Sequence, residues 1–209
     1  MKSAKIEYFS PITIRVPKDD IFSRLGYQRA KTRLNAEQKI QTERFIEEAV
    51  SFITVQGAAC RVTIAQEEEG LIRLANGTIF QSRQLSLFLK GCKEILLMAA
   101  TAGKEITQMI EQESKDDNLT RGVVFDAVAS EMVDGSLDWI MGYYNRQLRR
   151  ESLSLTKNRF SAGYGDFLLQ NQRKMFSLLD LKRLGITLTK ACVLIPEKSV
   201  TAIAGIKEG

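Results

Sequence analysis

The chain has 209 residues, of which 44% are apolar and 26% are charged, so it can bury a hydrophobic core and has an ordinary globular composition. Its formal net charge of +5, from 30 Lys and Arg against 25 Asp and Glu, favours acidic partners only weakly. The lack of histidine excludes Ser-His and Cys-His nucleophile pairs and removes the commonest zinc ligand. Any chemistry of this chain is therefore expected to rely on positioning groups, with no residue assigned as catalytic or metal-ligating.

The sequence carries no sign of a membrane segment or of export. No apolar run approaches the length needed to span a bilayer, and the N-terminal MKSAKIEYFSPI lacks the apolar region of a signal peptide. The three cysteines (Cys60, Cys92 and Cys192) are scattered and form no CxxC pair. This pattern predicts reduced thiols, mostly small core residues, in a cytoplasmic protein.

Short helices and strands are expected near the N-terminus. Residues 13–17 (TIRVP) have the pattern of a short strand, and residues 19–26 that of a brief helix stopped by a glycine. A stronger helix begins at Asn35, where Gln38 supplies the capping-box partner, and is expected to end at Gly57.

The next segments favour a sheet. Residues 60–64 (CRVTI) alternate apolar and polar side chains, which indicates a half-buried strand. Residues 71–80 (LIRLANGTIF) are typical of a strand, an Asn-Gly turn and a second strand. Ser82 is placed to cap a helix over residues 83–90 that ends at Gly91.

The centre of the chain holds its most apolar run and its longest helical pattern. Residues 94–101 (EILLMAAT) predict a strand covered on both faces. A helix is expected over residues 104–114, followed by a long helix over residues 119–150 with Asn118 as its cap. Residues 167–180 (FLLQNQRKMFSLLD) predict a further helix.

The C-terminal residues 184–206 are expected to form strands broken at Pro196. Helical and strand periodicities are therefore mixed along the whole chain. This pattern predicts an α+β fold with a mostly antiparallel sheet flanked by helices. Because repeats, low-complexity tracts and linkers are absent, residues 1–209 are expected to form a single domain.

The stretch RFSAGYGD, residues 159–166, is the main candidate for a binding site. The sequence argues against a dinucleotide-binding loop, because the 44 residues after Gly165 are too few to complete a doubly wound sheet. Two interpretations remain: a surface turn whose glycines supply positive φ angles, or a cradle for a charged small molecule. An arginine fork suits a carboxylate, and a tyrosine ring can face a cation such as a sulfonium. An amino acid joined to a sulfonium and an adenosine would satisfy both groups.

The order of short motifs along the chain favours the second of these interpretations. RFSAGY has the form RxxxGY and is followed by FSLLD, GITLT, IPEKSV and a final apolar strand. This order resembles the S-adenosylmethionine-binding activation (reactivation) domain of cobalamin-dependent methionine synthase, in particular its free-standing forms. EILLMAATAG resembles the family's central strand and DAVASEM its long helix, so that the resemblance covers roughly residues 85–206. The fold implied is an antiparallel twisted sheet with flanking helices.

The resemblance also implies the residues that contact the ligand. Arg159 would bind the methionyl carboxylate, and an acidic pocket residue on the long helix would be Glu131 or, as the alternative, Asp134. The motif would supply the rest, with the backbone of Phe160, Ser161 and Ala162 beside the adenine and a cradle completed by Gly163 and Tyr164.

The sequence departs from the family pattern in three respects: the residue after the glycine-tyrosine pair, two acidic positions and the C-terminal tail. Gly165 stands where the fused domains have proline, and Leu153 lies about where they carry an acidic residue. An acidic residue near the start of the domain and a C-terminal tail with a tyrosine also have no visible counterpart. A shallower pocket and a weaker affinity are therefore expected.

The function implied is a repair reaction performed with other proteins. The chain would present S-adenosylmethionine to cobalamin held by a methionine synthase that lacks its own activation domain, with a flavodoxin- or ferredoxin-like electron donor. Two alternatives stay open: a reactivator of another corrinoid methyltransferase, or a non-catalytic module that binds a ligand or nucleic acid. The basic, aromatic YYNRQLRR at residues 143–150 is the feature behind the last of these, although it is also typical of a solvated helix end.

Overall fold

The computed structural model describes residues 5–27, 35–115 and 118–209. A seven-stranded antiparallel sheet runs through the molecule, with strand order β4-β3-β2-β5-β9-β6 and β1 paired to β2. The predicted α+β class with an antiparallel sheet is confirmed. The strands are β1 (Glu7–Phe9), β2 (Gln56–Glu68), β3 (Leu71–Leu74), β4 (Ile79–Gln81), β5 (Glu94–Thr101), β6 (Leu153–Leu155) and β9 (Ser199–Glu208).

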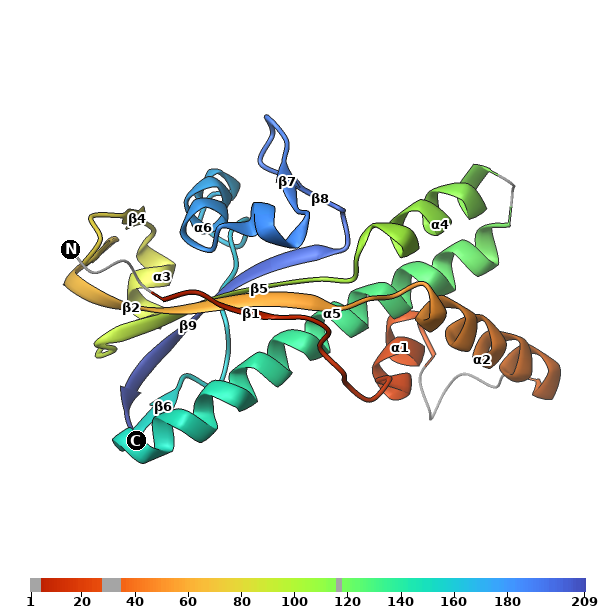
Figure 1. Cartoon of the computed structure of the whole chain (residues 1–209), viewed down its shortest axis with the longest axis horizontal. Helices are drawn as coiled ribbons and strands as arrows, with labels where there is room; N and C mark the ends of the chain where they lie inside the picture. The colour runs from red at the N-terminus through yellow and green to blue at the C-terminus, as the bar shows by residue number, and fades with distance from the viewer. Residues whose placement is uncertain (1–4, 28–34, 116–117) are drawn as a thin grey trace.

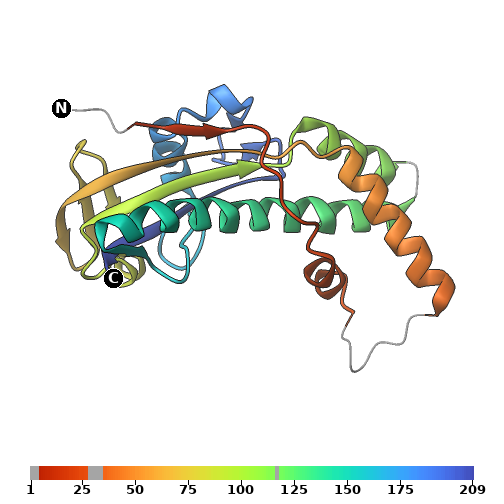
Figure 2. The same cartoon turned by 60° about the horizontal axis from the view of Figure 1, so that its bottom comes forward.

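Helices cover the two faces of this sheet unequally (Figure 1). The long helix α5 (Leu119–Leu148) runs along one face, and Figure 2 shows it extending past the sheet to meet the helices near the N-terminus. The other face carries α6 and a small two-stranded hairpin. The remaining elements are α1 (Lys18–Arg24), α2 (Ala36–Ser51), α3 (Arg83–Phe88), α4 (Lys104–Lys115), α6 (Gln172–Leu178), β7 (Thr187–Leu188) and β8 (Leu194–Ile195), with 3-10 turns at Arg149–Glu151, Leu169–Asn171 and Leu181–Leu184.

Strand β5 separates two hydrophobic cores. Alternate side chains of a strand point to opposite faces, so Leu96 and Met98 join the core under α5, while Ile95 and Leu97 join the core under α6. All four side chains are fully buried. The prediction of a strand covered on both faces over residues 94–101 is therefore confirmed.

Local signals placed several elements correctly. The Asn35 side chain accepts a hydrogen bond from the Gln38 backbone N–H at 2.7 Å, and the reciprocal bond completes the capping box of α2. Ser82 caps α3 through the Leu85 N–H at 2.9 Å. The predicted Asn-Gly turn joins β3 to β4.

Two predictions about where elements lie or end are wrong. Residues 13–17 form no strand, because after Ile12 bonds to Val55 the chain leaves the sheet and crosses toward α1; the N-terminal strand is β1. Helix α2 ends at Ser51, not at Gly57, which lies inside β2. Asn118 is the N-cap residue of α5, as predicted, although its side chain makes no cap hydrogen bond.

Two other elements differ from expectation in length. The predicted strand over residues 60–64 is the middle of the longer β2, which pairs with β5 along its first part and with β3 along its second. The predicted helix over residues 167–180 is divided into a 3-10 turn and the short α6.

Gly57 is required where α5 crosses β2. A Cβ atom built there would lie 2.9 Å from the Ala99 carbonyl oxygen and 2.9 Å from the Cδ1 atoms of Ile12 and Ile140. These distances are below normal van der Waals contact, and one of the three atoms belongs to the backbone of β5. Glycine at this position therefore sets how closely the helix approaches the sheet.

Asp166 attaches the candidate loop to the start of α3. Its carboxylate accepts the Ser82 hydroxyl at 2.5 Å and the Arg83 backbone N–H at 2.7 Å. The preceding Gly165 has φ +55°, a conformation closed to proline, and approaches the Gln84 side chain closely. The proline of the family pattern is thus incompatible with this backbone, which accounts for one departure noted in the sequence.

We expect Gly57→Ala to destabilise the protein by about 1–3 kcal/mol, because the added methyl group overpacks the contact between α5 and the sheet. Urea unfolding followed by circular dichroism measures this. Gly142→Ala is the matched control, since its Cβ would meet only Arg146 Nη1, at 3.7 Å, and alanine favours a helix by up to about 1 kcal/mol. Equal stability of the two variants would contradict this account.

We expect Asp166→Asn to be less stable than wild type near pH 7, with a difference that shrinks as the pH falls below 3.8, the ordinary pKa of an aspartate. The Ser82 hydroxyl, and then the Arg83 and Gln84 N–H groups, lower the pKa of Asp166 from its ordinary 3.8. A lowered folded-state pKa contributes stability that is complete above the unfolded pKa and is lost as pH falls through the folded one. Urea unfolding at several pH values tests this, with Asp180→Asn as control; a difference independent of pH would refute it.

Candidate functional site

Backbone pairing with β9 fixes the start of the candidate loop. The Phe160 N–H donates to the Ile203 carbonyl at 2.8 Å, and the Ile203 N–H donates back to the Phe160 carbonyl at 2.8 Å. The Phe160 ring lies in the core under α6, against Phe88 and Phe167. The neighbouring Arg159 therefore extends to the opposite side, toward α5.

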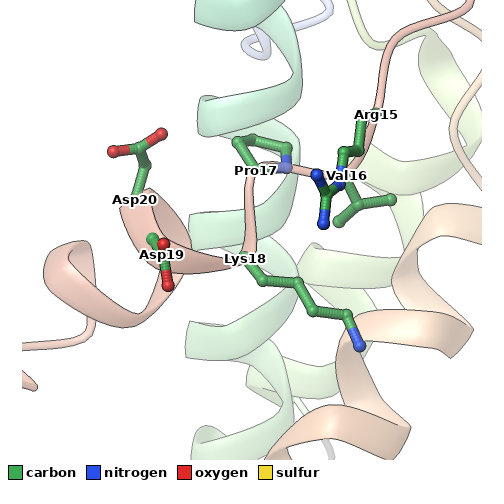
Figure 3. Close-up of a pocket in the computed structure, with 6 residues that line it drawn as sticks. All are labelled: Arg15, Val16, Pro17, Lys18, Asp19 and Asp20. Atoms are coloured by element: carbon green, nitrogen blue, oxygen red, sulfur yellow. The ribbon is translucent and has the colours of Figure 1, made fainter.

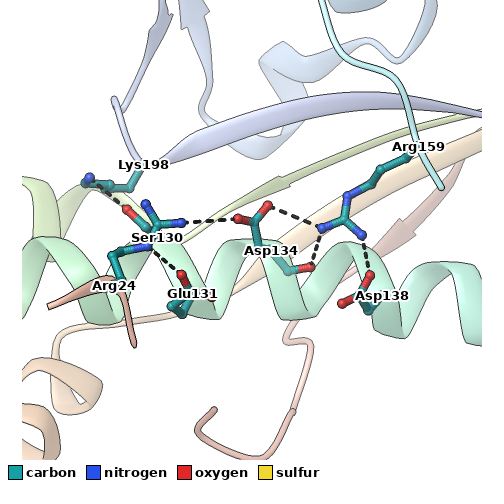
Figure 4. A network of polar contacts seen from close by, with 7 residues as sticks. All are labelled: Arg24, Ser130, Glu131, Asp134, Asp138, Arg159 and Lys198. Carbon is teal, nitrogen blue, oxygen red and sulfur yellow. Dashed lines mark hydrogen bonds and ion pairs between the residues drawn. The ribbon is translucent and has the colours of Figure 1, made fainter. Parts of the chain in front are cut away.

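The Arg159 guanidinium contacts two carboxylates on α5 (Figure 4). Nη1 donates to Asp138, and Nη2 lies 3.4 Å from both the side-chain Oδ1 and the backbone oxygen of Asp134. Asp134 and Asp138 are one turn apart and so share a face of the helix. The Arg159 side chain keeps 24% exposure, whereas Asp138 keeps 68%. The arginine is thus held by surface carboxylates and is not enclosed by them.

The same face of α5 carries further ion pairs (Figure 4). Arg24 of α1 lies 2.5 Å from Glu131 and 3.6 Å from Asp134. The hydrogen bond that Arg24 donates to the Glu131 carboxylate raises the pKa of Arg24, which stays charged. Lys198, just before β9, lies 2.5 Å from Asp126 and 3.0 Å from the Ser130 hydroxyl. Acidic residues of one helix are therefore matched by cations from three separate segments.

A cavity of about 370 Å³ opens beside Arg159. This volume falls within the range of small-molecule sites, about 300–1,000 Å³. Polar groups of both charges border it next to aromatic and aliphatic surface. The lining residues are Asp134, Arg159, Phe160, Ser161, Tyr164 and Val200.

The structure brings together four of the predicted site residues, Arg159, Phe160, Ser161 and Tyr164, at this cavity. Of the two alternative acidic residues, Asp134 lines it. Glu131 lies one turn away along α5, where it is paired with Arg24 and has a side chain only 16% exposed.

The remaining predicted residues, Ala162 and Gly163, stabilise the loop and are not among the residues that line the cavity. Ala162 packs against the core under α6. Gly163, at φ +96°, donates its N–H to the Phe167 carbonyl at 2.7 Å, which closes the turn. The backbone N–H and carbonyl of Phe160 are both bonded to Ile203 in β9. The loop is thus a turn whose glycine has a positive φ angle, and part of the same loop borders the cavity.

Tyr164 is the most exposed aromatic residue of the loop. It retains 69% of its surface, and its ring borders the cavity without burial in the core. An exposed ring face beside a cavity can accept a cation at about 6 Å or less. The cavity thus combines a guanidinium, a carboxylate and an available π face.

Sequence reasoning missed Asp138, Arg24 and Val200. Asp138 had a visible signal, because it follows Asp134 by four residues and must lie on the same helix face. Arg24 had no such signal in the sequence, because its contact with α5 depends on how the N-terminal segment folds back onto that helix. Val200 lies in β9 and borders the cavity because β9 pairs with the loop.

A larger cavity of about 690 Å³ lies at the start of α1, away from these residues (Figure 3). Arg15 and Lys18 extend to one side of the chain there, while Asp20 extends to the other. Its charges are therefore not directed at one point, and none of the residues predicted from the sequence lines it.

Other chemistry has little support in the part of the chain that the structure describes. No group of three or more His, Cys, Asp or Glu residues is arranged to hold a metal ion there. Cys60, Cys92 and Cys192 are buried, and burial raises the pKa of the Cys60 thiol to about 12. Within the same residues, none of the helices has both the length and the apolar character required to cross a bilayer.

Comparison with protein-family models finds no match, and comparison with curated proteins finds none either. Among solved structures, the chain is similar to the one described as the crystal structure of the MetH reactivation domain bound to AdoHcy. The TM-score is 0.65 at 13% sequence identity, and the match covers 96% of this chain and 78% of that one. The likeness therefore extends through nearly the whole chain, including the N-terminal part that the sequence left undiagnosed. The protein has the fold of the MetH reactivation domain.

Proposed function

We propose that this protein binds S-adenosylmethionine in the cavity beside Arg159 and serves as a free-standing reactivation subunit for a cobalamin-dependent methionine synthase. The observation that supports it most is the position of the RxxxGY arginine, which lies at a cavity with Asp134 and Tyr164 in this fold. The similar structure is of a domain bound to AdoHcy, the demethylated form of the same ligand.

The charges of the cavity match an amino acid. Arg159 would receive the α-carboxylate through its planar fork, and Asp134 would receive the α-ammonium group. The two side chains lie 3.4 Å apart, so they can bind neighbouring groups of one ligand. The adjacent Tyr164 ring would face the sulfonium.

The ion pair between Arg159 and Asp138 does not block this mode of binding. Asp138 is 68% exposed, and exposed ion pairs are worth only about 0–1 kcal/mol. A ligand carboxylate can therefore take the place of the Asp138 carboxylate at little cost. Asp134, at 44% exposure, is held also by Arg24 and would stay in position.

These residues would bind and orient, and they would not transfer protons. Bound S-adenosylmethionine would supply a methyl group that leaves its sulfur for the cobalt of a partner's corrinoid, once one electron from a flavodoxin- or ferredoxin-like donor has reduced that cobalt. Sulfur keeps the bonding pair and becomes a thioether, so charge and atoms balance. The contribution of this chain is proximity and orientation.

Of the alternatives, a reactivator for another corrinoid methyltransferase would use the same cavity and differs only in its partner. The nucleic-acid alternative loses its main support. Tyr144 of the YYNRQLRR segment is buried at 3% exposure, and Tyr143 packs between Phe9 and Trp139. Neither ring is free to stack on a base.

We expect calorimetry to show binding of S-adenosylmethionine or S-adenosylhomocysteine in preference to NAD or ATP. Arg159→Ala should weaken this binding by about 1.5–3 kcal/mol, or roughly 10- to 150-fold in Kd, the range for a hydrogen bond to a charged group. Arg159→Lys should recover only part of it, because a point charge cannot reproduce the fork.

Arg150→Ala is the matched control for these titrations, since it removes an exposed arginine beyond the end of α5. Thermal unfolding of each variant checks that the fold is retained. Tighter binding of ATP or NAD would exclude the proposed ligand, and unchanged binding by Arg159→Ala would exclude this cavity.

We expect the protein to speed the formation of methylcobalamin when it is mixed with a partner holding cob(II)alamin, a reductant and S-adenosylmethionine. Visible absorbance of the corrinoid reports the rate. Arg159→Ala should remove most of the acceleration at sub-saturating ligand, and the protein alone should transfer no methyl group to homocysteine. An equal rate with and without the protein, measured with the corrinoid partner of its own organism, would refute the reactivation role while leaving ligand binding to be judged by calorimetry.

A further inference from the structure

The positive charge of the chain is concentrated in the layer over the α6 face of the sheet. This layer, residues 167–195, contains α6, the 3-10 turn Leu181–Leu184 and the β7–β8 hairpin. It holds five cations (Arg173, Lys174, Lys182, Arg183 and Lys190) and one carboxylate (Asp180), a net +4 of the formal +5 of the whole chain. The rest of the sequence is nearly neutral, so almost all of the net positive charge of the chain lies in this layer.

Packing directs these cations outward. Phe167, Met175, Leu179 and Leu181 of the layer are fully buried in the core beneath it. Because the apolar side of the layer is used in that core, its basic side chains face solvent. Arg173 and Lys182 are exposed accordingly.

Two of the cations share a cavity of about 450 Å³ between α6 and β7. The cavity contains no carboxylate, and its walls add a phenyl ring, a leucine and two hydroxyl groups. The lining residues are Arg173, Phe176, Ser177, Lys182, Thr187 and Leu188.

The cavity cations differ from the ion-paired arginines elsewhere in the chain. Arg24, Arg61, Arg121 and Arg159 each contact at least one carboxylate. Within the ranges that the structure describes, neither Arg173 nor Lys182 has a carboxylate at ion-pair distance. Arg173 instead donates from Nη2 to the Lys190 backbone carbonyl at 2.5 Å, which orients the guanidinium and leaves its charge uncompensated.

We propose that this cavity binds a small molecule with a phosphate group and a flat apolar body. An oriented guanidinium and a lysine ammonium recognise phosphate through charge-assisted hydrogen bonds, and the Ser177 and Thr187 hydroxyls add polar contacts. Phe176 and Leu188 offer an apolar wall to the body of the ligand. A concave site of this volume suits a small molecule more than the convex surface of an acidic protein. The inference does not rest on the ligand proposed for the Arg159 cavity.

The test is calorimetry at low salt with inorganic phosphate, pyrophosphate, adenosine monophosphate and uncharged adenosine. We expect adenosine monophosphate to bind, adenosine to bind at least about tenfold more weakly, and the double variant R173Q/K182Q to lose at least about tenfold in affinity for the monophosphate. The matched control is K174Q/R183Q, which removes the same charge from the same layer. Lys174 contacts the Ile79 carbonyl and Arg183 lies over the Tyr8 ring, so both point away from the cavity.

The outcomes separate the cavity from a diffuse positive field. A loss confined to R173Q/K182Q supports the proposal, and thermal unfolding together with the single variant Lys182→Gln shows that the loss is not misfolding. Equal losses in both double variants would overturn it, as would no binding of the monophosphate by wild type or equal binding of adenosine. Poly-glutamate that binds wild type and is weakened equally by both variants would indicate an acidic protein partner instead. Affinity for S-adenosylmethionine should not change in R173Q/K182Q.

Discussion

The arrangement of the site depends on the two backbone hydrogen bonds between Phe160 and Ile203. Paired in this way, the chain is extended, and neighbouring side chains must point to opposite faces of the sheet. Phe160 therefore enters the core under α6, and Arg159 reaches the carboxylates of α5. A shift of this pairing by one residue would exchange the two positions and place a guanidinium in an apolar core, at a cost of several kcal/mol. The burial of Phe160 thus selects the position of Arg159.

The carboxylates on α5 provide the second half of the arrangement. Asp126, Asp134 and Asp138 are spaced by multiples of four residues, so they form one line along the helix. The cations that meet this line come from α1, from the loop and from the residue before β9. Each exposed pair contributes little to stability, but together they bring three distant segments to one surface. Any one of these pairs can therefore be broken at little cost in stability.

Elements governed by nearby residues could be predicted from the sequence, and those governed by distant contacts could not. The Asn35 capping box and the central strand follow from local chemistry and hydrophobic pattern. Gly57 was taken as a helix terminator because its actual constraint comes from Ile140, far along the chain. Whether Glu131 or Asp134 lines the cavity depends on a shift of one turn along α5, and Glu131 is paired with Arg24 from a distant segment. The motif order did indicate the fold, whereas neither the cavity between α6 and β7 nor the two cations that line it had a recognisable sequence signal.

The loop that carries Tyr164 is attached at both ends, by Phe160 to β9 and by Asp166 to the start of α3. Residues 161–165 therefore have few conformations open to them, and the turn closed by the Gly163 N–H reduces that number further. The loss of conformational entropy needed to order this segment occurs when the protein folds, so that it does not weaken the binding of a ligand afterwards. A flexible ligand with many rotatable bonds can then be held by a short stretch of chain, since the ligand contributes most of the disorder that binding must remove.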